Sequence, residues 1–424
     1  MQHYIYVLIL KEITGRVFIV LRKLIFFLSF FLHNQINAND VQWSSFGTLA
    51  LTLSDSERYG YRRDIRSDNG VYSGDIDLEE FSLIGGQLET NINNHIDLVG
   101  QVVFRDIAKP EWDDYISMAF MRYTPDSNWS FRLGRLSPNL FTITEYRNIN
   151  VAYTWANVPT EVYGIIPYLY YDGGDVTYST RINDAVLKTK FYLGWSDSTI
   201  TADSQSENIA LENMVGTSLI YDKNDWNLQA RYTQGKLSDE SSAISELHRQ
   251  IALIPEVIWP NKESFISDYS IKNKLAKYLS FSGQKYLGDW LFGFELAKVN
   301  SESEVISDLK SGYVSAAYHY NQHTFYSLFS KTDSNYYSFD EPEVYQEPIA
   351  PLIEAIETVG NFYSSNQTSM SMGWRWDITP SLASKLQYIR TKIEANGDTL
   401  WINTSAGSPE ETVNTFMFTL SFAL

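Results

Sequence analysis

Cysteine is absent from this chain of 424 residues, which excludes a disulfide framework and cysteine-based metal sites. Histidine is also scarce, and beyond residue 38 only His95, His248, His319 and His323 remain. No GxSxG or HExxH motif occurs. Because a hydrolase or a metal site needs such groups gathered together, the sequence predicts no enzyme, no metal site and no cofactor.

Basic residues are the minority, with 33 Lys and Arg against 51 Asp and Glu, and the formal charge of −18 argues against a nucleic-acid partner. Long apolar runs are missing too. Leu24–Leu32 has nine residues, too few to span a membrane as a helix. It follows Arg22 and Lys23 and precedes a polar stretch ending at Ala38, which is typical of an export signal. We therefore expect residues 1–38 to comprise a signal peptide and a misplaced upstream start, and residues 39–424 to form one domain.

Aromatic side chains are abundant, with 29 Tyr, 23 Phe and 11 Trp, and they favour β-structure. The mean hydropathy of −0.24 suits a soluble protein, but it also suits a membrane barrel. In such a barrel half of each strand faces water and only the other half faces lipid.

Apolar and polar residues alternate strictly in several segments. In the last segment, Thr412–Leu424, Phe and Leu occupy every second position from Phe416, and Thr, Met, Ser and Ala occupy the others. A period of two places the two sets on opposite faces of a sheet. The same alternation marks residues 187–195, 226–233, 290–297 and 369–376. A soluble sandwich also alternates, but it rarely places long cations and amides opposite the apolar face so often.

Short turns and long polar loops alternate along the whole chain. The seven short turns are Asn91–Asn94, Pro125–Asn128, Arg181–Ala185, Tyr221–Asp225, Leu287–Asp289, Asn321–Gln322 and Asp377–Ser381. This arrangement is typical of an outer-membrane barrel with tight periplasmic turns and long external loops. The sequence therefore predicts an all-β, transmembrane, antiparallel up-and-down barrel of about sixteen strands, wide enough to enclose an aqueous channel.

Aromatic residues stand at the edges of many apolar faces, as in the girdles of membrane barrels. They are Trp129, Trp195, Trp226, Tyr232, Trp290, Trp376 and Tyr388.

The signal, the strand number and the aromatic final strand together resemble the general porins of Gram-negative outer membranes. The final residue departs from that family, whose last strand normally ends in Phe, because this chain ends Phe422-Ala423-Leu424. The resemblance implies a homotrimer in the outer membrane, in contact with lipid and lipopolysaccharide, that passes small hydrophilic solutes. It also implies a third external loop that folds into the barrel and narrows it.

That third loop is identified as residues 137–172 by counting strands. It is rich in Tyr, Trp and Pro, which favours a loop packed on the inner wall, although a capping loop at a subunit interface is an alternative. Its carboxylates Glu145, Glu161 and Asp172 are candidates for the constriction.

Alternation assigns several charged side chains to the lumen, where they are candidates for the pore lining. The cations are Arg105, Arg132, Lys188, Lys190, Arg231, Lys274, Arg375 and Lys385, and the best inward acids are Glu89 and Glu295. A cationic wall opposite loop carboxylates sets a transverse field and gives a modest anion bias, whereas the acidic external loops favour cations.

Helical spacing appears in two external loops. In the fifth loop Ile244, Leu247, Ile251 and Ile254 recur on one face, and in the seventh loop a similar face includes Ile349 and Ile356. We expect these faces to pack on neighbouring loops.

The predicted function is a passive diffusion channel. A substrate-selective anion or sugar channel is the main alternative, the sugar version resting on a track of loop aromatics. A non-conducting structural or adhesive barrel is the weaker alternative.

Overall fold

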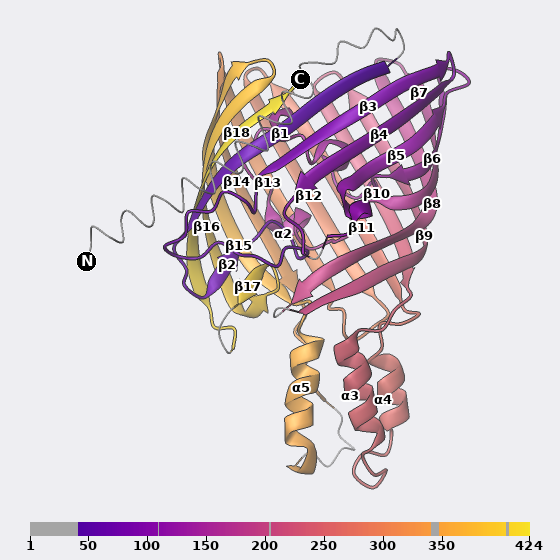
Figure 1. Ribbon diagram of the computed structural model, residues 1–424, viewed down its shortest axis with the longest axis vertical. Coiled ribbons are helices and arrows are strands. Elements are labelled where there is room, and N and C mark those ends of the chain that lie inside the picture. The colour runs from indigo at the N-terminus through magenta and orange to yellow at the C-terminus, as the bar shows by residue number, and fades with distance from the viewer. Residues whose placement is uncertain (1–40, 109, 203–204, 341–346, 404–406) are drawn as a thin grey trace, which may run out of the picture.

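The computed structural model describes residues 41–108, 110–202, 205–340, 347–403 and 407–424, so the expected signal segment lies outside the described residues. Sixteen antiparallel strands close into a single barrel (Figure 1). They are β1 (Val41–Ser54), β3 (Leu83–Asn93), β4 (Ile96–Arg105), β5 (Ile116–Tyr123), β6 (Trp129–Leu136), β7 (Tyr171–Ile182), β8 (Ala185–Ala202), β9 (Gln205–Lys223), β10 (Trp226–Leu237), β11 (Leu275–Leu287), β12 (Trp290–Ser301), β13 (Leu309–Tyr320), β14 (His323–Ser334), β15 (Ser365–Thr379), β16 (Leu382–Asp398) and β18 (Glu411–Ala423).

The first and last strands close the barrel. β1 pairs with β18 from Phe46 opposite Ala423 to Ser54 opposite Thr415, and the Ser45 amide donates to the Leu424 carbonyl at 2.8 Å. Closure leaves no free sheet edge, which satisfies the backbone without help from water. The predicted strand number and the role of the final segment as a strand are confirmed.

Seven short turns connect strands at one end of the barrel, hereafter the turn end, and the long loops lie at the other, the loop end. Several turns begin with a residue in the left-handed backbone region, as Asn183 (φ 55°), Asn321 (φ 53°) and Gly288 (φ 59°) show. Asn and Gly reach this region at the lowest steric cost. The predicted alternation of turns and loops is therefore confirmed.

Successive side chains point outward and inward as the alternation predicted. On β12, Phe292 and Leu296 are 42% and 56% exposed on the outer face, whereas Glu295 and Ala297 are buried inside. Aromatic residues such as Trp129, Trp290 and Trp376 remain exposed at the edges of the apolar outer band. The outer surface of the barrel is thus apolar, whereas its inner surface is polar.

Two further strands and several short helices lie in the loops. β2 (Tyr59–Tyr61) of loop 1 (residues 55–82) pairs with β17 (Trp401–Asn403) of loop 8 (residues 399–410). The other small elements are η1 (Trp112–Tyr115), η2 (Thr144–Tyr146), η3 (Asn150–Ala152), α2 (Thr160–Tyr163) and η4 (Glu347–Ile349).

Three helices project beyond the barrel at the loop end, below the strands in Figure 1. α3 (Ser242–Ala252) and α4 (Lys262–Asp268) belong to loop 5 (residues 238–274), and α5 (Ala350–Gly360) belongs to loop 7 (residues 335–364). α3 packs against both α4 and α5, so the predicted loop packing is confirmed, although α4 was not anticipated. No helix among the described residues is long and apolar enough to cross a membrane.

A charge placed between these helices should separate them from one another without opening the barrel. Ile251 is fully buried in their shared core, whereas Leu253, two residues on, is 74% exposed. We expect Ile251→Asp to destabilise the packed loops by roughly 3 kcal/mol or more, and Leu253→Asp to leave them intact. Limited proteolysis of the folded barrel should therefore cut loop 5 faster in the first variant alone. Equal cleavage of the two variants contradicts the assigned packing.

Candidate functional site: the lumen and its inward loops

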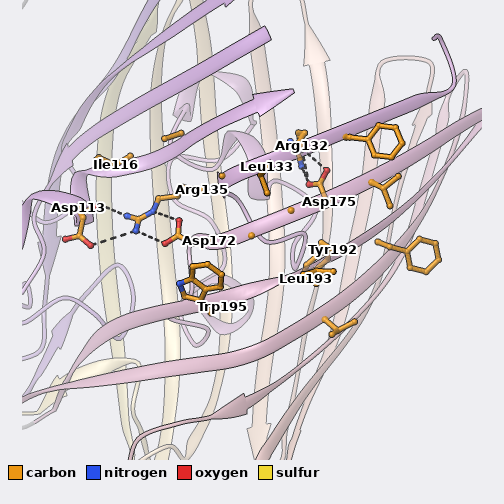
Figure 2. Close-up of a pocket in the computed structure, with 18 residues that line it drawn as sticks. Asp113, Ile116, Arg132, Leu133, Arg135, Asp172, Asp175, Tyr192, Leu193 and Trp195 are labelled. Atoms are coloured by element: carbon orange, nitrogen blue, oxygen red, sulfur yellow. Dashed lines mark hydrogen bonds and ion pairs between the residues drawn. The ribbon is translucent and has the colours of Figure 1, made fainter. Parts of the chain in front are cut away.

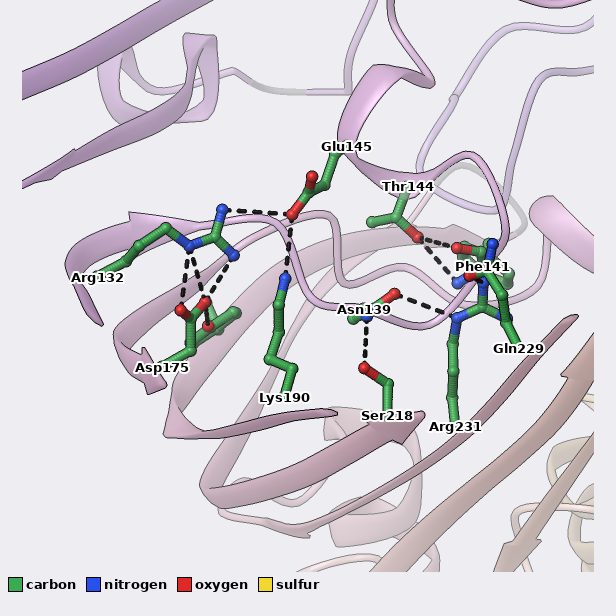
Figure 3. Close-up of polar contacts among 11 residues, drawn as sticks. Arg132, Asn139, Phe141, Thr144, Glu145, Asp175, Lys190, Ser218, Gln229 and Arg231 are labelled. Atoms are coloured by element: carbon green, nitrogen blue, oxygen red, sulfur yellow. Dashed lines mark hydrogen bonds and ion pairs between the residues drawn. The ribbon is translucent and has the colours of Figure 1, made fainter. Parts of the chain in front are cut away.

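Loop 3 (residues 137–170) leaves β6 and turns into the barrel. Its contact with the β6–β8 wall is electrostatic. Glu145 accepts hydrogen bonds from Arg132 of β6 at 3.2 Å and from Lys190 of β8 at 3.1 Å (Figure 3). Arg132 also binds Asp175 of β7 through Nη2 at 2.6 Å. Lys190, followed by Arg132, holds the pKa of Glu145 well below its usual value, against the opposing effect of burial, and keeps this bridge charged.

A buried ion pair fixes residues of the loop on either side of Glu145. Arg231 of β10 and Glu295 of β12 approach to 3.8 Å, and both side chains are inaccessible to solvent. Arg231 donates to Asn139 of loop 3 at 3.1 Å, and Glu295 accepts from the Thr142 amide at 3.2 Å and from the Tyr163 hydroxyl at 2.8 Å. Loop 3 thus supplies the hydrogen bonds that a buried ion pair needs.

The far end of the loop docks on the opposite wall. Glu161 accepts from Ser330 of β14 at 2.8 Å, from Gln367 of β15 at 2.7 Å and from Ser369 of β15. Lys385 of β16 donates to three carbonyls of loop 3, those of residues 150, 153 and 155, at 2.6 to 2.8 Å. Loop 3 therefore crosses the lumen from the β6 wall to the β14–β16 wall.

Loop 1 folds inward and meets loop 3. The Ile65 amide donates to the Gly164 carbonyl at 3.1 Å, and the Asp64 carboxylate lies 3.6 Å from Arg147. The apolar side chains of loops 1, 5, 7 and 8 join one continuous cluster, which includes Tyr61, Ile251 and Trp401. The loop end of the lumen is consequently filled to a large extent by the chain itself.

A cavity of about 440 Å³ remains beside the β5–β10 wall. Four cations line it together with hydroxyl and amide groups and the single carboxylate Glu145. The cations are Arg122, Arg132, Lys188 and Lys190. Lys188 is exposed, whereas Arg122 is bound to Glu89 at 2.6 Å and to Asp97 at 2.9 Å. Open polar space therefore lies next to a mainly basic wall.

The remaining expected site residues fall into two groups. Arg231, Glu295 and Lys385 of the wall face the lumen but are buried under loop 3. Glu161 of loop 3 is buried against β14 and β15, and Arg375 is largely covered and donates to the Tyr153 carbonyl at 2.7 Å. These five hold loop 3 rather than line open space. Arg105 lies in a separate cavity of about 40 Å³ together with Arg66 and Arg147.

Two expected lumen residues lie at strand ends. Asp172 pairs in register with Trp195, which is 57% exposed on the outer face, so the assignment of Asp172 to the constriction is wrong. Figure 2 shows Asp172 bound to Arg135, which also reaches Asp113. Lys274 stands one residue before β11, where its carbonyl still accepts from the Leu237 amide at 3.0 Å, and its side chain lies 3.8 Å from Asp268. Its place in the pore lining stays a prediction. For Asp172 the strand boundary, which alternation alone does not fix, decided the outcome.

Sequence reasoning missed three groups of this region, namely Arg122, Asp175 and the Asp64–Arg147 pair. Asp175 was recognisable in principle, since it stands directly opposite Arg132 in the β6–β7 register. Arg122 lies in a segment where alternation is poor. Asp64 and Arg147 belong to two loops far apart in sequence, so no local pattern could pair them.

Comparison with known proteins identifies the fold. No family model and no curated protein matches the chain. Solved structures do match, among them OmpT of Vibrio cholerae (12% identity, 92% of this chain and 99% of that one, TM-score 0.52). Others are an anion-selective porin from Comamonas acidovorans (11%, 91% and 100%, 0.51) and the channel DcaP of Acinetobacter baumannii (11%, 91% and 99%, 0.53). The chain has the sixteen-stranded barrel fold of outer-membrane porins.

Loss of the Glu161 acceptor should release the far end of loop 3. Glu161→Ala leaves the donors of Ser330 and Gln367 without this acceptor in a buried site, at about 1–3 kcal/mol for each unsatisfied group, whereas Ser369 keeps Thr391 as a partner at 2.8 Å. We expect a lower thermal unfolding midpoint and a larger, noisier single-channel conductance. Glu161→Gln, which keeps an acceptor, should stay close to the wild type. An unchanged conductance in the alanine variant contradicts the docking of loop 3 as a restriction.

The stability of loop 1 should depend on pH through Glu80 and should fall in alkaline solution. Burial raises the pKa of this carboxyl to about 8, although Arg63 opposes the shift. The pKa of Glu80 in the folded protein exceeds the usual value of about 4.3. The stabilisation contributed by its protonated carboxyl is therefore complete below about pH 4 and is lost as pH rises through about 8.

We therefore expect the thermal unfolding midpoint of the wild type to fall between pH 6 and pH 9, and that of Glu80→Gln to change less. The neighbouring Glu79 is exposed, so Glu79→Gln is the matched control and should titrate like the wild type. If the unfolding midpoint of Glu80→Gln depends on pH as strongly as that of the wild type, another group is responsible for the pH dependence.

Proposed function

We propose that this protein is a passive diffusion channel for small hydrophilic solutes and ions in the outer membrane of a Gram-negative bacterium. The observation that carries the proposal is a closed barrel that is apolar outside and polar inside, with an open cavity of about 440 Å³ next to the inner wall. An apolar outer band requires hydrocarbon around it, and a polar lumen requires water. Diffusion down a gradient needs no cofactor and no reaction.

We further infer a preference for small anions. Exposed Lys188 forms no ion pair among the described residues, whereas Arg122, Arg132 and Lys190 are bound to carboxylates, so the inferred preference rests mainly on Lys188. The transverse field proposed for the constriction rests on Glu145 of loop 3 facing Arg132 and Lys190. The similar Comamonas protein is described as anion-selective, which supports the same direction.

A sugar track is the weaker alternative. Trp155 and Tyr163 of loop 3 are buried, and Trp155 packs edge-on against Tyr313 of the barrel wall at 5.3 Å. Rings held in this way offer no free faces to a passing sugar. An enzymatic barrel has little support, because His248 lies on α3 whereas His95, His319 and His323 lie at turns of the opposite end.

We also propose a homotrimer. β5 and β6 have eight residues each, whereas β8 and β9 have eighteen and nineteen. Eight residues tilted by about 45° cover roughly 19 Å, less than the apolar band of about 25 Å typical of such barrels. A neighbouring copy of the chain, packed against the short strands β5 and β6, covers the part of this wall that the lipid bilayer does not cover.

Planar-bilayer recording of the purified protein under a salt gradient tests the channel and its selectivity. We expect conductance steps in groups of three and a reversal potential on the anion side. Folded protein that shows no conductance overturns the channel and leaves a structural or adhesive barrel.

Reversal of one cavity charge should change the selectivity. Lys188→Glu should lower the anion-to-cation permeability ratio roughly twofold or more, with the larger effect at low salt, where the charge is less screened. Lys223→Glu is the matched control, since Lys223 lies at a turn, 3.1 Å from Asp184, and outside the cavity. Equal effects of the two variants contradict a selectivity site at the cavity wall.

A further inference from the structure

A small cavity lies where loop 1, loop 3 and the inner wall of the barrel meet. It has a volume of about 40 Å³, and arginines from three different segments line it. They are Arg66 of loop 1, Arg105 at the end of β4 and Arg147 of loop 3. This cavity, hereafter the arginine cavity, shares no cation with the larger cavity beside the β5–β10 wall.

Positive charge exceeds negative charge around the arginine cavity. Asp114 is the one carboxylate among its described lining residues, and its Oδ2 atom already accepts from the Glu111 amide at 2.8 Å. Asp64 lies outside the lining and is shared by two arginines, at 3.2 Å from Arg66 and 3.6 Å from Arg147. Two carboxylates therefore stand against three guanidinium groups.

Arg147 keeps a donor that the chain does not pair. Its side chain is only 8% exposed, and its Nη2 atom donates to the Tyr163 carbonyl at 2.7 Å. Its Nη1 atom is buried and has no hydrogen-bond partner within the described ranges. Burial lowers the pKa of Arg147, although Asp64 opposes the shift. Because an unpaired charged donor is costly to bury, this group needs an acceptor from outside the chain.

The size and the lining of the cavity favour a small anion. A single water needs roughly 10–15 Å³ of cavity volume, so about 40 Å³ admits one small ion and excludes an organic solute. Guanidinium groups stay charged at physiological pH and bind anions through charge-assisted hydrogen bonds. Ser137 and Asn148 also line the cavity, and a hydroxyl or an amide can donate a further hydrogen bond.

We propose that the arginine cavity binds one small inorganic anion, such as chloride, which joins loop 1, loop 3 and β4. The anion supplies an acceptor to Arg147 and neutralises the excess positive charge. Loops 1 and 3 already meet at this point, since the amide of Ile65, the neighbour of Arg66, donates to the Gly164 carbonyl at 3.1 Å. A bound anion therefore stabilises the arrangement in which both loops narrow the lumen.

Exchange of chloride for a larger anion tests this assignment in the full-length folded protein. Sodium chloride replaces sodium gluconate stepwise at constant total sodium, because gluconate is too large for the cavity, and the thermal unfolding midpoint is measured. We expect the midpoint of the wild type to rise with chloride and to saturate. A midpoint that does not change when chloride replaces gluconate overturns the proposal.

Arg105 is the residue to substitute, because the hydrogen bonds that join loops 1 and 3 do not involve it. In Arg105→Gln the chloride concentration for half of the rise should increase about tenfold or more, since one charge-assisted hydrogen bond is lost. Arg181→Gln is the matched control, because Arg181 is exposed on β7 at the turn end, and it should behave like the wild type. A wild-type chloride dependence in Arg105→Gln, or an equal loss in the control, overturns the proposal.

Bromide gives a direct readout that needs no variant. Crystals of the wild type soaked in sodium bromide should show an anomalous peak in contact with Arg66, Arg105 and Arg147. A cavity without this peak overturns the proposal, also in the case that Arg105→Gln does not fold. Neither measurement requires conductance, so the anion site and the proposed channel function can fail independently of each other.

Discussion

The need to satisfy every backbone hydrogen bond in hydrocarbon is the constraint on which this structure depends. A sheet with a free edge exposes unpaired donors and acceptors to lipid, and closure between β1 and β18 removes that edge. Closure fixes which face of every strand looks outward, and so divides each segment into an apolar and a polar set. The outer apolar band, the polar lumen and the separation of turns from loops all follow from it.

Closure also creates an interior that the chain must fill or leave to water. Loop 3 crosses this interior because each wall it reaches presents a charged or polar partner, from Arg132 on one side to Lys385 on the other. The buried Arg231–Glu295 pair is tolerated because loop 3 supplies its further hydrogen bonds. The loop and the wall therefore stabilise each other, and the space left open lies where the wall is basic.

Charge is sorted by position in the same way. Cations gather on the cavity wall, whereas the projecting loops hold much of the acidic excess. Local concentrations of one sign act over about 8 Å at physiological salt, so the lumen and the projecting loops respond to different partners. The net charge of the chain describes neither of them.

The sequence by itself determined the barrel, its strand number, its turns and the faces of its strands, because a period of two and a turn signal are local properties of the chain. It also located the inward loop and the helices around Ile251 and Ile356, whose spacing is equally local. Only the tertiary structure decided which inward charges stay open and which lie under loop 3, since Glu161 and Lys385 meet partners more than two hundred residues away. It also decided that Asp172 faces outward, because the side of a residue at a strand end depends on a register that neighbouring strands impose.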